Sequence, residues 1–106
     1  VSEMDVKAKK RKDGYVLTLS GELTIYTAEA AFTQIFAKPA WFESNVTINM
    51  HQVVELDTAG VQLLFMLIRE VGPEGKVTFE QVSESVESVL SLLRLQSICH
   101  GESVSL

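Results

Sequence analysis

The spacing of apolar residues changes along this chain, and the change limits the folds that the chain can adopt. In residues 46–50 apolar and polar side chains alternate, a period of two that is typical of a strand with one buried face. Residues 28–36 instead carry apolar side chains at positions i, i+3, i+4, i+7 and i+8, which predicts an amphipathic helix. Because the two periods succeed one another along the chain, we expect an α/β domain in which helices cover the apolar face of a sheet.

Period-two patterning predicts four strands and a short fifth one, at residues 6–9, 15–19, 46–50, 77–80 and 103–106. The first two strands would form a hairpin around Asp13-Gly14, a dipeptide typical of type I′ turns. After the third strand we expect a loop over residues 51–56. The alternation of strands and helices implies a mixed sheet, with right-handed crossovers in its parallel part.

The first and third predicted helices have clear boundary signals. Thr27 is placed to cap the first helix, which we expect to end because of Pro39. Ser83 is placed to cap the third helix, whose apolar face includes Val86, Val89, Leu90 and Leu93. Both helices would therefore turn one apolar side to the sheet.

The middle helix, from about Thr58 to residues 72–73, is different because it is apolar nearly all round. Gln62 is the only polar residue between positions 61 and 68. A helix of this kind is either central in the core or also covers a partner-binding face.

Together these elements predict a mixed four- to five-stranded sheet with helices mainly on one face, in a single domain spanning residues 1–106. The length of 106 residues leaves room for only one core. We expect the strand residues of that core to face apolar residues of the second and third helices; the set is Val46, Ile48, Met50, Val77 and Phe79 against Leu64, Ile68, Val89 and Leu93.

Charge and cysteine content narrow the function classes. The net charge of −5 argues against nucleic-acid binding, which needs a basic face. The one basic run, residues 9–12, is either a patch for anionic surfaces or a solvated hairpin tip, and the adjacent turn signal favours the tip. A lone cysteine, Cys99, fits a reducing compartment, and no apolar run is long enough for a leader or a membrane span. We therefore expect a cytoplasmic protein without direct membrane insertion.

No set of residues predicts catalysis or a bound cofactor. Cys99 and His100 are adjacent but lack a separate base or orienting acid, and His51 with Asp57 does not make a metal site. No glycine-rich phosphate loop is present. We expect a protein that is not an enzyme, holds no cofactor and no metal, and works by binding another protein.

The most informative motif opens the middle helix. Asp57 and Thr58 can each satisfy free backbone N–H groups there, and Gly60 keeps the first turn unobstructed. A phosphate on the Thr58 hydroxyl would lie at the positive end of the helix dipole. Thr58 is therefore either a simple N-cap or a modification site, and the residues alone leave both interpretations open.

Three motifs in order resemble those of one family. Residues 57–61, Asp-Thr-Ala-Gly-Val, resemble the Asp-Ser-Ser-Gly-Leu signature of STAS domains, which include the anti-sigma factor antagonists. Residues 19–24, Leu-Ser-Gly-Glu-Leu-Thr, and the following Tyr26-Thr27-Ala28 resemble the entry to that family's first helix, and residues 85–93 resemble its closing helix. The resemblance covers about residues 6–106.

This resemblance implies a regulatory binding module in a partner-switching pathway. The unmodified domain would bind an anti-sigma factor or switch kinase, and phosphorylation at Thr58 would release it. The implied partner-binding residues are Thr24, Asp57, Thr58, Ala59, Gly60 and Gln62, with Gly60 allowing a partner backbone to approach. The alternative that it implies is an accessory STAS subunit of an Mla-type phospholipid ABC transporter, which braces the ATPase.

The chain departs from the family pattern at three positions. Thr24 and Asn49 stand where the antagonists usually have aspartate, and Ala59 replaces the second serine of the signature. The Thr58 hydroxyl itself is preserved.

Overall fold

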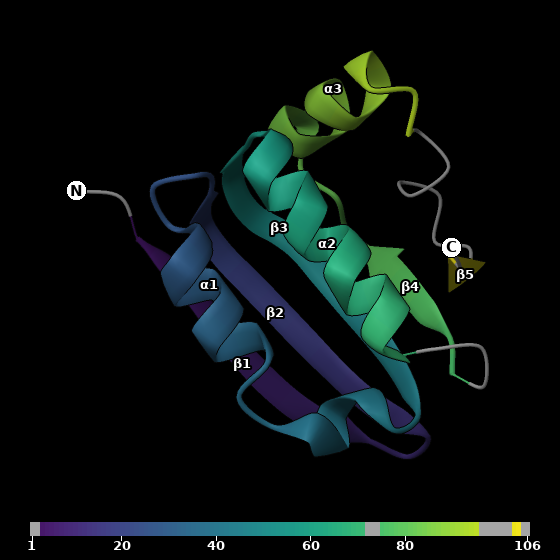
Figure 1. Ribbon diagram of the computed structural model, residues 1–106. Helices are drawn as coiled ribbons and strands as arrows, with labels where there is room; N and C mark the ends of the chain where they lie inside the picture. Colours follow the sequence, from purple (N-terminus) through teal and green to yellow (C-terminus); the bar gives the residue numbers. More distant parts are fainter. Residues whose placement is uncertain (1–2, 72–74, 96–102, 105–106) are drawn as a thin grey trace.

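The computed structural model describes residues 3–71, 75–95 and 103–104, and its centre is a five-stranded mixed sheet (Figure 1). The strands are β1 (Met4–Arg11), β2 (Gly14–Leu23), β3 (Asn45–Leu56), β4 (Val77–Glu80) and β5 (Ser103–Val104), adjacent in that order. The β1–β2 and β4–β5 pairs are antiparallel, whereas β2–β3 and β3–β4 are parallel. The predicted mixed sheet of four to five strands is confirmed.

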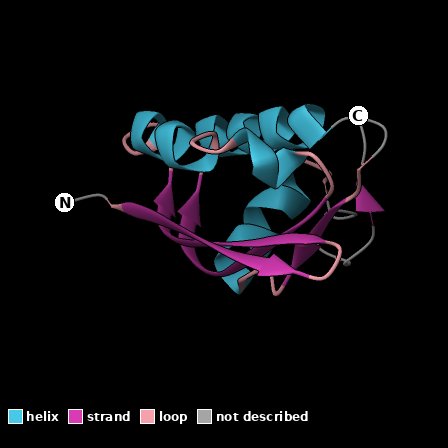
Figure 2. Cartoon of the chain, turned by 90° about the horizontal axis from the view of Figure 1, so that it is seen from below, coloured by secondary structure: helices cyan, strands magenta, loops and turns pink. Residues whose placement is uncertain are grey.

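Within the described residues, four helical segments accompany the sheet: α1 (Ala28–Ile35), the 3-10 turn η1 (Pro39–Phe42), α2 (Thr58–Val71) and α3 (Glu84–Leu92). α1 and α2 lie over the same face of the sheet, and α3 packs against the far end of β3 (Figure 1). Figure 2 shows most of the helical residues along one side of the strands, whereas one helix runs down past the level of the strands. This arrangement confirms the prediction of helices mainly on one face.

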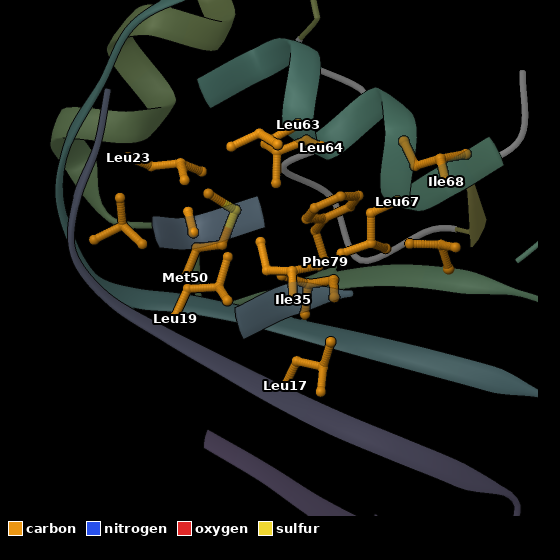
Figure 3. Close-up of a cluster of buried hydrophobic side chains, with 14 of the residues drawn as sticks. Leu17, Leu19, Leu23, Ile35, Met50, Leu63, Leu64, Leu67, Ile68 and Phe79 are labelled. Carbon is orange, nitrogen blue, oxygen red and sulfur yellow. The ribbon is translucent and has the colours of Figure 1, made fainter. Parts of the chain in front are cut away.

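The core lies between that face and α2. Leu17, Ile48 and Phe79 are aligned across β2, β3 and β4, and none of the three is exposed. Leu64 and Leu67 of α2 are buried as well, and they lie over these strand residues (Figure 3). The alternation of apolar and polar residues at positions 46–50 predicted that one face of the strand is buried, and the aligned apolar residues of the three strands form that face.

The strand positions that alternate with these core residues point to the opposite face of the sheet. There the row Thr18, Asn49 and Glu80 is polar and half-buried, and the row Val16, Thr47 and Thr78 is mostly small. The polar character of these positions explains why the sheet needs covering on one side only.

Two predictions about β2 and β3 are wrong. Residues 51–56 continue β3 instead of forming a loop. The hairpin loop is Lys12-Asp13 rather than Asp13-Gly14, because Arg11 pairs with Gly14, and no positive φ occurs at these positions, so the turn is not type I′. Gly14 belongs to the strand, and a Cβ on it would lie 1.9 Å from the carbonyl oxygen of Asn45.

Three helix-end predictions also need correction. α1 ends at Ile35, and Pro39 begins η1 instead of terminating α1. Thr27 occupies the N-cap position of α1, but its hydroxyl makes no capping bond. Leu93 follows the end of α3 and is 41% exposed, because Arg94 turns the chain with a φ of 59°. The inward face of α3 is formed by Val86 and Leu90.

Candidate functional site

The candidate site is the start of α2, where one carboxylate connects the helix to the loop after β2. Asp57 Oδ1 accepts a hydrogen bond from the Gly60 N–H, with 3.1 Å between N and O. Its Oδ2 accepts another from the Ile25 N–H at 2.9 Å. Asp57 is thus the N-cap of α2, and the same side chain fixes the loop over residues 24–27 against the helix.

Two buried threonines fix the shape of that loop. The Thr27 hydroxyl donates to the Glu22 carbonyl oxygen at 2.6 Å and accepts from the Thr24 N–H at 3.0 Å. Thr24 Oγ1 accepts from the Tyr26 N–H at 3.3 Å. Because Thr24 and Thr27 are only 4% and 3% exposed, Thr24 supports the site from within, although the family resemblance placed it at the partner contact.

Gly60 is also internal. It is buried, and a Cβ built on it would lie 2.2 Å from the Leu23 carbonyl oxygen and 2.7 Å from Leu56 Cδ1. Glycine is therefore required here because α2 starts directly against the end of β2. The backbone that approaches Gly60 in this structure belongs to the chain itself, not to a partner as the resemblance implied.

Thr58, unlike Thr24, Thr27 and Gly60, is not buried. It is the first residue of α2 and is exposed, as is Gln62 one turn later, while Ala59 between them is half-buried. Since Asp57 makes the capping bond, Thr58 is not the N-cap. Its side chain lies at the positive end of the helix dipole, where an anion is stabilised.

Apolar side chains surround this exposed helix start. Ile25 and Tyr26 are 68% and 85% exposed in the loop that Asp57 holds. On the other side lies a shallow hollow of about 340 Å³, lined by Thr58, Val61, Gln62, Phe65, Leu93 and Leu95. Large exposed apolar groups around one polar centre are typical of protein-binding surfaces.

The exposed positions of these apolar residues were not predicted from the sequence. Ile25 and Tyr26 precede the first helix and lie outside its apolar period, which was the available signal that they do not join the core. Leu93 was assigned to the core, although it falls beyond the helix end.

Residues 3–71, 75–95 and 103–104 include no group of three or more His, Cys, Asp or Glu side chains that could hold a metal ion. Within the same residues, no helix combines the length and the apolarity needed to cross a bilayer. His51 lies exposed on β3, and its N–H donates to Asn49 Oδ1 at 3.0 Å. Cys99 and His100 lie outside the described residues.

Fold and site together define an open mixed-sheet α/β domain whose exposed hydroxyl and apolar residues gather at one helix start. The model of the STAS domain matches residues 5–104, so the chain belongs to the STAS domain family. The resemblance in the three sequence motifs is thereby confirmed. A comparison with curated protein sequences gives no match.

Solved structures of anti-sigma factor antagonists share this fold. An antagonist from Mycobacterium paratuberculosis is 19% identical, with a TM-score of 0.79 over 92% of this chain and 84% of that one. Unphosphorylated SpoIIAA is 20% identical, with a TM-score of 0.65 over 90% of this chain and 85% of that one. The phosphorylated form of Bacillus SpoIIAA is 18% identical, with a TM-score of 0.63 over 90% of this chain and 88% of that one. At these identities the likeness shows the fold alone.

Proposed function

We propose that this chain is a non-enzymatic protein-binding module of a partner-switching pathway, controlled by phosphorylation of Thr58. The surface around the start of α2 binds an anti-sigma factor or switch kinase, and the phosphorylated form releases it. The observation that carries the proposal is that Thr58 is exposed and free of the capping role, which Asp57 performs. The antagonist titles of the similar structures, one of them in a phosphorylated form, support it.

The physical basis is a difference between the free and the bound domain. A phosphate adds about −1.5 to −2 charges, and the positive end of α2 stabilises them in the free domain. In a complex the same charge would lie beside the Asp57 carboxylate on a surface from which water is excluded. Burying unpaired charge there costs several kcal/mol, on the order of what holds a micromolar complex together.

The two departures from the family's aspartates fall on residues with structural hydrogen bonds. Thr24 is buried in the loop, and Asn49 lies on the sheet face opposite the core, where its side chain donates to Gln81 Oε1 at 3.3 Å. Their replacement therefore leaves the exposed surface around Thr58 intact. In the accessory-subunit alternative, the same surface residues brace an ABC ATPase and Thr58 is not modified. The affinities of Thr58 variants distinguish this alternative from the phosphorylation switch.

The test measures affinity for the kinase or ATPase encoded beside this chain, using wild type, Thr58→Ala and Thr58→Asp. Thr33→Asp is the matched control, because Thr33 is an exposed helical threonine on α1. We expect Thr58→Asp to weaken binding by more than about tenfold, and Thr58→Ala and Thr33→Asp to stay within about threefold. Melting temperatures should remain within about 4 °C of wild type for all three variants.

Two results would contradict the proposal. Wild-type affinity of Thr58→Asp for the kinase would eliminate the switch. Loss of ATPase binding by Thr58→Ala, with no phosphate incorporated from ATP by any neighbouring kinase, would establish the accessory-subunit function instead.

A further inference from the structure

A second surface lies at the opposite end of the sheet and carries the opposite charge. The β1–β2 turn and the start of β3 meet there (Figure 1). Arg11 pairs with Gly14, and Gly14 pairs with Asn45. The Lys76 N–H donates to Asn45 Oδ1 at 3.2 Å, and its carbonyl oxygen accepts from the Val46 N–H at 2.8 Å. The strand register therefore brings Lys76 to the same sheet end as the basic run, although the two are far apart in sequence.

A hollow of about 300 Å³ lies between these cations. Arg11 and Lys76 are among its lining residues, together with Asn45 and the hydroxyl-bearing Thr47 and Thr78. Asp13 contributes one carboxylate to the lining, so the charge of the lining remains positive. Guanidinium, ammonium, hydroxyl and amide groups together are donors suited to the oxygens of a phosphate.

Further cations lie on both sides of Arg11 along the chain. Lys9, Lys10 and Lys12 are all exposed, and successive side chains on a strand point to opposite faces. We call residues 9–12 together with Lys76 the basic tip. Its charges spread to both sides of the turn, so one small anion in the hollow cannot contact all of them.

We infer that the basic tip docks on the headgroups of anionic phospholipids, with one lipid phosphate in the hollow between Arg11 and Lys76. A membrane surface offers many phosphates in one plane, which suits cations that spread around a projecting turn. Each cation held near such a surface strengthens attachment by roughly fivefold.

The remaining charges of the domain orient it on that surface. Exposed or half-buried carboxylates at the α2 end of the sheet and around α3 include Glu22, Glu55, Asp57, Glu84 and Glu87. Near the basic tip Asp13 and Glu43 offset two of its five positive charges, so the tip remains positive. The domain is 33 Å long in its largest dimension, several times the Debye length of about 8 Å at physiological salt. An anionic membrane would therefore attract the basic tip and leave Thr58 facing away from it, accessible to a protein partner.

The composition of the neighbouring sheet face favours lipid over nucleic acid. Surfaces that bind single strands without sequence preference stack bases on aromatic side chains. Val16, Thr47 and Thr78, on the strands beside the basic tip, cannot stack on a base. Tyr15 is the single aromatic residue among those that line the hollow, and it is half-buried, so a nucleic-acid strand would find one ring there and not a series of them.

The experiment is flotation of the whole chain with mixed phosphatidylglycerol–phosphatidylcholine vesicles and with pure phosphatidylcholine vesicles. We expect attachment to the mixed vesicles only, and its loss at several-fold higher salt. Replacing all four cations of residues 9–12 by Gln should lower the partition constant by more than about tenfold, and Lys76→Gln alone by a few-fold. Asp13→Asn should strengthen attachment, because it removes the carboxylate from the hollow.

Arg94→Gln is the matched control, since it removes one exposed charge next to Leu93 and Leu95, which line the hollow at Thr58, and it should change the partition constant by less than about twofold. Equal attachment to pure phosphatidylcholine, or wild-type attachment of the fourfold Gln variant, would overturn the proposal. Displacement by inorganic phosphate at constant ionic strength would assign the hollow to a free anion instead. Tighter binding to a single-stranded oligonucleotide than to the mixed vesicles would assign the basic tip to nucleic acid and overturn it as well.

Discussion

The two ends of the sheet are built on different principles. At the α2 end, hydrogen bonds that involve the side chains of Asp57 and Ser83 tie together segments that are distant in sequence, and the Thr27 hydroxyl fixes the loop between them locally. At the basic tip, the backbone pairing of β1 with β2 supports side chains that are exposed and charged. The first end depends on geometry that one substitution can break, whereas the second depends on the number of charges. Substitutions should therefore affect stability strongly at one end and weakly at the other.

The largest loss of stability is expected for Gly60→Ala. The new methyl group would collide with the Leu23 carbonyl oxygen and with Leu56, so α2 must move away from β2. We expect the free energy of unfolding to fall by about 3 kcal/mol, measured by urea denaturation. Gln62→Ala, on the exposed side of the same turn, should change it by less than about 0.5 kcal/mol. Equal stability of the two variants would show that the close approach of helix and strand is not needed.

The next largest effect is expected for Asp57→Ala, which removes the acceptor for two backbone N–H groups. The unfolding free energy should fall by about 2 kcal/mol, and amide exchange at Ile25 and Gly60 should accelerate. Asp57→Asn keeps an acceptor oxygen and should lose about half as much. If exchange at Ile25 were unchanged in Asp57→Ala, the carboxylate would not be holding the loop.

A smaller effect is expected for Ser83→Ala at the start of α3. The Ser83 hydroxyl donates to the Val53 carbonyl oxygen at 2.6 Å and accepts from the Val86 N–H at 3.3 Å. Its removal should lower the unfolding free energy by about 1 kcal/mol. The control is Ser85→Ala, an exposed position within the helix, where no loss is expected. A comparable loss in both variants would reflect a general sensitivity of α3 and not the cap.

The smallest effect is expected at the basic tip. The double variant Lys10→Gln and Lys12→Gln should keep the unfolding free energy within about 0.5 kcal/mol of wild type, as judged by thermal denaturation. A loss above about 1 kcal/mol would show that these lysines stabilise the hairpin, and the contrast between the two ends would disappear.

The sequence predicted most of the fold because local period and burial agree over most of the chain. Val46, Ile48, Met50, Val77 and Phe79 all lie in the core as expected. The end of β3 escaped prediction because its pairing with β2 shifts register twice, which inserts extra residues into β3. Buried positions therefore continue at Val53 and Leu56 with a spacing of three, which resembles neither a regular strand nor a helix.

The candidate site was predicted less completely than the fold. Placement of Thr58 at the start of a helix followed from the motif, but the division of roles between neighbours did not. Whether Asp57 or Thr58 caps α2 depends on where the loop at Ile25 lies, and that is a tertiary contact. The burial of Gly60 likewise depends on β2, which is distant in sequence.

The long parallel β2–β3 ladder also has a consequence for how the chain folds. β1 and β2 are joined by a two-residue loop, so their hairpin closes locally, whereas β2 and β3 must be brought together across α1 and η1. Loop closure of this kind is entropically unfavourable until the ladder forms. We therefore expect the rate-limiting step of folding to be the docking of β3 beside β2. Substitutions at Leu17 and Ile48, which pair across that ladder, should slow folding more than they speed unfolding.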